Sequence, residues 1–127
     1  MDKKSDMDPS QEFLMNSLED IVSILKTIAH INRFRILILL LKGPLTFQML
    51  LEQMDIKKSA LANDLAELKD SNLVDKIQHG TYEISENGKN YVKSIEKTYR
   101  ESMDIEKKVW ESKQRERLSK SFLERKH

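Results

Sequence analysis

Residues 56–74, IKKSALANDLAELKDSNLV, decide the fold that this sequence predicts. Within them Leu61, Leu65 and Leu68 recur at helical spacing and would face a core. The opposite side carries small and hydrogen-bonding residues that can lie close to base edges in a major groove: Lys58, Ser59, Ala62, Asn63 and Ala66. The pattern predicts a recognition helix over residues 59–71, with Ser59 as a candidate cap, that runs directly into a strand. Such a helix points to DNA binding and not to catalysis.

Three helical segments precede the recognition helix. Residues 11–29 carry apolar residues at near-heptad spacing, which predicts one amphipathic helix. Residues 31–42 are almost entirely apolar after Arg35, so the helix predicted there would be central to the core, and Gly43-Pro44 would end it. Residues 46–54 are the predicted first helix of a helix-turn-helix. Thr46 is its expected N-cap, and Leu45-Thr46 allow a short strand before it.

A hairpin and a long helix follow the recognition helix. Two β segments, 74–78 and 81–85, are joined by His79-Gly80, where Gly80 can take the positive φ of a tight turn. A cap at Ser85 or Asn87 would start the final helix. The predicted fold class is therefore mainly α with a small β-hairpin wing, a winged helix-turn-helix with a long C-terminal dimerisation helix. We expect a disordered N-terminus over residues 1–10, a DNA-binding domain over 11–88, and a dimerisation helix with a basic, mixed-charge tail over 89–127.

Composition limits the class of protein. The chain has 127 residues, of which 39% are apolar and 34% charged, enough for one modest core and an extension. It contains no cysteine, so disulfides, zinc fingers and thiolate chemistry are excluded. The longest apolar run, 36–41, is too short to cross a bilayer, and the first residues lack the apolar segment of a signal peptide. We expect a cytoplasmic protein that does not bind membranes.

Charge is distributed unevenly along the chain. The formal net charge is +1 overall, but it is −4 over residues 43–88 and +5 over residues 89–127. Because nucleic-acid binders usually gain affinity from a basic footprint, the acidic helix-turn-helix segment argues against tight DNA binding. The basic excess of the last helix and tail would add phosphate contacts or form a coiled-coil surface of alternating Lys and Glu.

The order helix–helix–helix–turn–helix–hairpin–helix resembles that of the ArsR-like winged-helix transcriptional regulators of bacteria and archaea. Residues 25–37, LKTIAHINRFRIL, and residues 56–74 carry the resemblance together with the hairpin. The long last helix is similar to that of small archaeal winged-helix dimers, which pair through a coiled coil. The resemblance implies a homodimeric regulator of transcription, by the family's habit a repressor, without a cofactor. Metal-sensing members use Cys pairs, or carboxylate and His ligands on the last helix. This chain has no Cys, and its last helix has no His before His127, so no metal is expected.

The resemblance implies a set of DNA-contacting residues. The groove-facing positions are Lys57, Lys58, Ser59, Ala62 and Asn63. Asn63 would read adenine, and the two lysines would lie near phosphates at the helix N-terminus. The wing residues Lys76, His79 and Gly80 would reach an adjacent minor groove. The alternative for all of these positions is an ordinary solvated surface.

The same resemblance bears on two charged positions. Asp64 stands where the family often has a basic or neutral polar residue that faces DNA, so an acid that repels phosphate is expected there. Arg33 is expected to pair with an acid on a neighbouring helix and not to contact phosphate.

Two apolar stripes predict the dimer interface. The residues are Leu14, Leu18 and Ile21 near the N-terminus and Val92, Ile95, Tyr99, Met103 and Trp110 on the last helix. Both stripes would also suit an intramolecular core. The last helix, however, is too long to lie wholly on so small a domain, and its far half would need a partner.

Two other function classes compete with a specific regulator. A winged helix that has lost tight DNA binding would serve as a protein-interaction adaptor, which the acidic balance of residues 43–88 favours. A non-specific, chromatin-like DNA-binding protein is the third reading. No catalytic constellation is recognisable, and the three glycines form no phosphate-binding loop.

Overall fold

The computed structural model describes the backbone of residues 6–125 and side chains as far as Ser121. The chain divides into two compact units, one ending at Lys89 and one starting at Asn90. Among the described residues, no helix combines the length and apolar character needed to cross a membrane. The predicted fold class is confirmed, because helices dominate and one small antiparallel sheet carries the wing.

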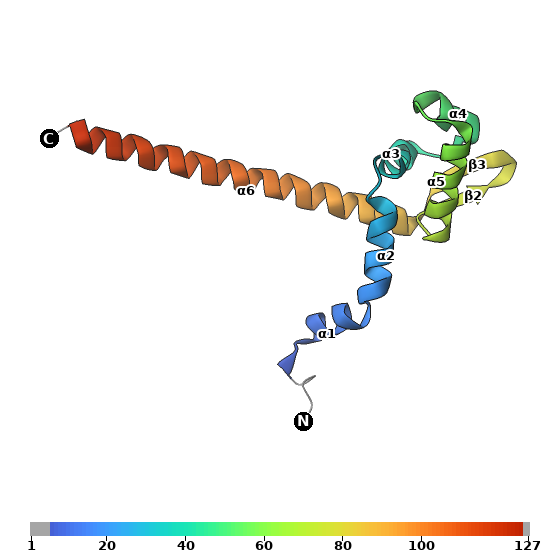
Figure 1. The fold of residues 1–127 in the computed structure, drawn as a ribbon, viewed down its shortest axis with the longest axis horizontal. Coiled ribbons are helices and arrows are strands. Elements are labelled where there is room, and N and C mark those ends of the chain that lie inside the picture. Colours follow the sequence, from blue (N-terminus) through green and yellow to red (C-terminus); the bar gives the residue numbers. More distant parts are fainter. Residues whose placement is uncertain (1–5, 126–127) are drawn as a thin grey trace. The chain divides into compact units, whose positions relative to one another are not determined.

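The core of the first unit lies between helices α2 (Leu18–Ile28), α3 (Ile31–Leu39) and α5 (Lys58–Asp70). In Figure 1, α5 lies between α3 and the β-hairpin. Ile36 and Leu37 of α3 are completely buried, which confirms that this apolar segment is central. The helix is shorter than predicted, because its last turn tightens into the 3-10 helix η2 (Leu40–Lys42) before Gly43.

The sheet has three antiparallel strands in the order β1 (Leu45–Thr46), β3 (Thr81–Ile84), β2 (Val74–Ile77). The short strand expected at Leu45-Thr46 is therefore present and pairs with β3. Val74 lies opposite Ile84, and both are buried. Each strand of the hairpin is one residue shorter than predicted, because Gln78–Gly80 form the short 3-10 turn η3 at its tip.

The predicted helix over residues 11–29 is two helices, α1 (Pro9–Asn16) and α2, separated at Ser17. The N–H of Ser17 still donates to Phe13 and Leu14, so the chain bends at this residue without losing its hydrogen bonds. Helix α1 also starts two residues before the predicted boundary. Asp8 and Gln11 form a capping box, and Pro9 occupies the first turn. Residues 1–5 of the segment predicted to be disordered lie outside the described residues.

Helix α4 (Phe47–Gln53) and helix α5 form the helix-turn-helix. The hydroxyl of Thr46 accepts from the N–H of Met49 at 3.1 Å, so the predicted cap is confirmed. Helix α5 begins and ends one residue before the predicted positions, with Lys57 and not Ser59 as its N-cap. It ends because Asn72 takes a left-handed conformation (φ 59°), and the N–H of Leu73 returns to the carbonyl of Leu68.

Helix α6 (Glu86–Arg125) has 40 residues, which corresponds to about 60 Å at 1.5 Å per residue. Its cap is Ser85, the first of the two predicted candidates, whose hydroxyl accepts from the N–H of Gly88 at 2.9 Å. The same hydroxyl donates to the carbonyl of Asn72 at 2.7 Å. A single residue thus separates β3 from α6 and fastens the start of the helix to the end of α5.

Candidate nucleic-acid interface

Helix α5 presents two distinct sides. Leu61, Leu65 and Leu68 are at most 2% exposed and face the core. The side chains of the predicted groove-facing residues are all exposed: Lys57, Lys58, Ser59, Ala62 and Asn63. The exposed side is therefore narrow and uncharged in its centre, with its lysines at the helix N-terminus. The first N–H groups of a helix have no intrahelical partner and favour an anion such as a phosphate.

Asp64 does not lie on this exposed side, so the expectation that it faces DNA is wrong. The residue is 9% exposed, and its carboxylate accepts from the Nε of Arg33 at 3.1 Å. The spacing explains the result, because Asp64 follows Leu61 by three residues and precedes Leu68 by four. The predicted pairing of Arg33 with an acid on a neighbouring helix is confirmed, and Asp64 is that acid.

A second polar contact positions the other end of α5. The hydroxyls of Thr27 on α2 and Ser71, the C-cap of α5, lie 3.0 Å apart. Thr27 is buried, and its hydroxyl also donates to the carbonyl of Ser23. Sequence patterns did not single out this pair, since neither residue interrupts an apolar stripe in a way that reveals its partner. Together with Arg33 and Asp64, the pair fixes α5 at both ends.

The wing residues are exposed, but they differ in setting. His79 and Gly80 form the tip, and both have positive φ, 59° and 65°. A histidine in this region is less common than glycine or asparagine, and it turns the side chain out at the tip. Lys76 lies lower on the hairpin, directly opposite Tyr82, with its Nζ 5.9 Å from the ring centroid. The tip and the lysine are thus separate features of the wing.

The acidic excess of residues 43–88 is smaller at the surface than the sequence suggests. One of its eight acidic residues is Asp64, which is buried and paired with Arg33. The others are exposed or half-buried. Two of them, Asp75 and Glu83, lie directly opposite each other on β2 and β3, away from α5.

The residues predicted to form a dimer interface fall into exposed and buried sets. Leu14, Leu18, Tyr99, Met103 and Trp110 are between 51% and 68% exposed within the single chain. Ile21 and Ile95 are half-buried. Val92, in contrast, is only 4% exposed and offers little surface to a partner. In the described part of the chain, no group of three or more His, Asp or Glu residues is placed to hold a metal ion.

Residues 31–76, from α3 through β2, match the model of the bacterial regulatory proteins of the arsR family. The chain is an ArsR-like winged helix-turn-helix protein. It carries the DNA-binding fold of ArsR-family transcriptional regulators, and this confirms that it belongs with regulators and not with enzymes. No curated protein matches the sequence significantly.

Solved structures of regulators share the fold of this ArsR-like protein. Reduced HlyU from Vibrio cholerae N16961 is 29% identical, with a TM-score of 0.60 over 70% of this chain and 97% of that one. The transcriptional regulator HlyU from Vibrio vulnificus CMCP6 is 26% identical, with a TM-score of 0.59 over 71% of this chain and 98% of that one. The transcriptional repressor BigR from Xylella fastidiosa shares the fold at 23% identity, with a TM-score of 0.54 over 60% of this chain and 78% of that one.

Proposed function

We propose that this protein is a sequence-specific, double-stranded DNA-binding regulator of transcription that acts in the cytoplasm as a homodimer, and that it represses by occupying its operator. The observation that carries the proposal is the exposed side of α5. Ser59, Ala62 and Asn63 are exposed there, opposite a row of leucines that is almost completely buried. Small side chains let a helix approach base edges closely, and an amide can read adenine in bidentate fashion.

Each part of the site takes a different task in this proposal. Asn63 reads a base, while Lys57 and Lys58 bind phosphates at the start of α5. His79 and Gly80 at the tip of the wing lie near the adjacent minor groove, with Lys76 contributing charge from the hairpin. The repressor role is supported by the regulatory family and by BigR, a repressor of the same fold.

Exposed apolar surface supports the homodimer. Leu14 and Leu18 are 51% and 54% exposed, and Trp110 is 62% exposed. Contiguous apolar surface of this kind marks an interaction site on soluble proteins. Two copies related by a two-fold axis would place two recognition helices on half-sites about one DNA turn apart.

Selection of bound fragments from genomic DNA, followed by titration of the selected duplex at several salt concentrations, tests this function. The wild type should retain a preferred sequence at moderate salt. Lys57→Ala/Lys58→Ala should weaken all sequences alike and reduce the salt slope by about 0.9 for each phosphate contact that is lost. Lys42→Ala/Lys69→Ala removes the same charge from exposed positions away from the start of α5 and should change the affinity much less.

Loss of the amide should have a different signature. Asn63→Ala should relax the preference at one base pair of each half-site by about 1–3 kcal/mol and leave the salt slope unchanged. Competition between duplexes that differ at single positions measures this. A uniform loss across all positions would contradict a base-reading role for Asn63.

A protein-interaction adaptor is the second candidate function, because seven exposed or half-buried acidic residues accompany four lysines in residues 43–88. An adaptor should bind no duplex even at low salt. A steep salt slope without any preferred sequence would indicate non-specific DNA binding instead.

A further inference from the structure

One side of α6 changes character along the helix. Tyr99, Met103 and Trp110 follow each other at spacings of four and seven, so they share this side, and they are 65%, 54% and 62% exposed. Beyond Trp110 the same side turns basic and, with the indole, lines a shallow hollow: Lys113, Arg117 and Lys120. We call these six residues the apolar-to-basic stripe.

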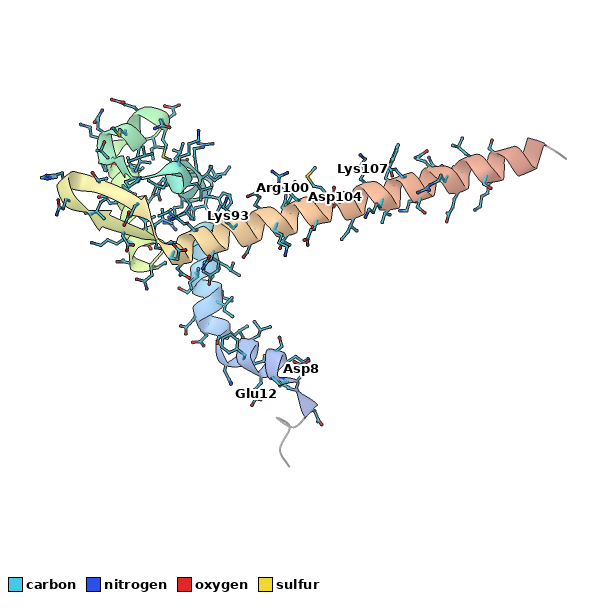
Figure 2. All side chains as sticks on the ribbon, turned by 180° about the vertical axis from the view of Figure 1, so that it is seen from behind. Asp8, Glu12, Lys93, Arg100, Asp104 and Lys107 are labelled. Atoms are coloured by element: carbon cyan, nitrogen blue, oxygen red, sulfur yellow. The ribbon has the colours of Figure 1, made fainter. Side chains whose placement is uncertain are left out.

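A different side of α6 carries a charged row. Lys93, Arg100, Asp104 and Lys107 lie along one side of the helix (Figure 2). Arg100 also donates from its Nε to Glu96 at 3.0 Å. Because this row is strongly charged, the three large apolar residues of the stripe identify the side of α6 that a partner would cover.

The charges of the stripe decide how a second copy can lie on it. In a parallel, in-register pair, each residue lies level with its own copy. Lys113 would then face Lys113 of the partner subunit, and Arg117 would face Arg117 of the partner subunit. Glu106, on the same side between Met103 and Trp110, would face its copy too. Like charges placed directly opposite at a partly desolvated interface oppose association.

We propose that two α6 helices pair antiparallel along this stripe, with the two-fold axis passing between Asp104 and Ile105. This rests on the homodimer of the proposed function. In this register Tyr99 lies level with Trp110 of the partner subunit, which brings two exposed aromatic rings together. Glu96 lies level with Lys113 of the partner subunit, so each basic end meets an acid.

The free oxygen of Glu96 makes this pairing possible. The Oε2 atom of Glu96 accepts from Arg100 within the chain, and Oε1 remains for the partner's Lys113. Each pair occurs twice about the two-fold axis. The stripe therefore specifies orientation and register as well as providing apolar area.

Disulfide cross-linking tests the arrangement cleanly, because the full chain contains no cysteine. Glu96→Cys and Lys113→Cys are each made alone, and the two proteins are then mixed, exchanged and mildly oxidised. Positions 96 and 113 are about 25 Å apart along one helix, well beyond the reach of a disulfide. Neither variant should cross-link by itself, whereas the mixture should give a mixed 96–113 dimer.

Controls separate this proposal from the dimer on which it rests. Asp104→Cys lies next to the proposed axis but in the charged row, so it should not cross-link. Light scattering on the unmodified protein gives the mass. A monomer would overturn both the homodimer and the pairing, whereas a dimer that cross-links 96 to 96 and 113 to 113, or at none of these positions, would overturn the antiparallel pairing alone.

A charge exchange provides an independent measurement. Lys113→Glu should weaken self-association about tenfold, because two attractive pairs become repulsive. Adding Glu96→Lys to the same chain should restore most of the loss. Equal dissociation constants for the single and double variants in sedimentation equilibrium would contradict the Glu96–Lys113 contact.

Discussion

Asp64 shows how strongly one residue can change the interpretation of a recognition helix. Read from its neighbours in the sequence, it places a negative charge on the DNA side of α5. In the structure it faces α3 and pairs with Arg33, with both side chains almost buried. A buried ion pair contributes little net stability by itself, but each partner depends on the other. The pair therefore determines which side of α5 is exposed.

Breaking this pair should destabilise the protein markedly. Arg33→Met leaves the carboxylate of Asp64 with no ionic partner and should lower the free energy of unfolding by about 3 kcal/mol. Urea denaturation measures the loss. Arg33→Met/Asp64→Leu removes both charges and should recover most of the stability. If the double variant is no more stable than the single variant, the contact is not the source of the loss.

At the level of secondary-structure elements, the junction between the wing and α6 is the most constrained part of the first unit. Ser85 is the only residue between β3 and α6, and its N–H donates to the carbonyl of Leu73 at 3.0 Å. One turn later, Gly88 is buried against the same carbonyl and the side chain of Ile84. A side chain at position 88 has no space.

Gly88→Ala should therefore destabilise the fold, although alanine ordinarily favours a helix by about 1 kcal/mol over glycine. The added Cβ would contact the backbone carbonyl of Leu73 and lie 2.8 Å from Cγ1 of Ile84. Since the carbonyl belongs to backbone and has little freedom to move, we expect a net loss of about 1–3 kcal/mol in thermal or urea unfolding. Asn87→Ala, at the exposed neighbouring position, should change stability by less than about 0.5 kcal/mol.

Periodicity predicted the elements but not their joints. The leucines of α5, the apolar run of α3 and the cap at Thr46 all follow local rules, and each was found where it was expected. The bend at Ser17 was not predicted, because the apolar spacing continues through it.

The candidate site shows the same division. Exposure of Asn63 and the lysines follows from helical spacing alone. The partner of Asp64 lies 31 positions away in the sequence, and no local pattern names it. Residues that position the site thus depend on tertiary contacts, while those that would touch DNA follow from the helix.

At the scale of the whole chain, the two units have different compositions and different tasks. The first unit holds the recognition helix and the wing and has the core. The second unit is one helical segment whose large apolar residues are mostly exposed. A single helix without a partner is marginally stable in water, so this unit depends on association for its stability.

Removal of residues 104–127 should convert the protein to a monomer, because it deletes Trp110 and the basic part of the stripe. Light scattering of the truncated and full-length chains compares their masses. Affinity for a two-half-site operator should fall steeply, since one recognition helix would then bind alone. The circular dichroism and unfolding of the first unit provide the control. A truncated chain that remains dimeric would place the interface on α1 and α2.

The direct passage from β3 through Ser85 into α6 leaves the chain without slack. A flexible loop would absorb any torsion of the helix, but here the hydroxyl of Ser85 and the close fit of Gly88 hold the first turn against the strand. Rotation of α6 about its own axis would therefore be transmitted to the base of the wing. The wing is geared to the helix, and a change in how two copies grip each other would reach the DNA-facing tip as movement.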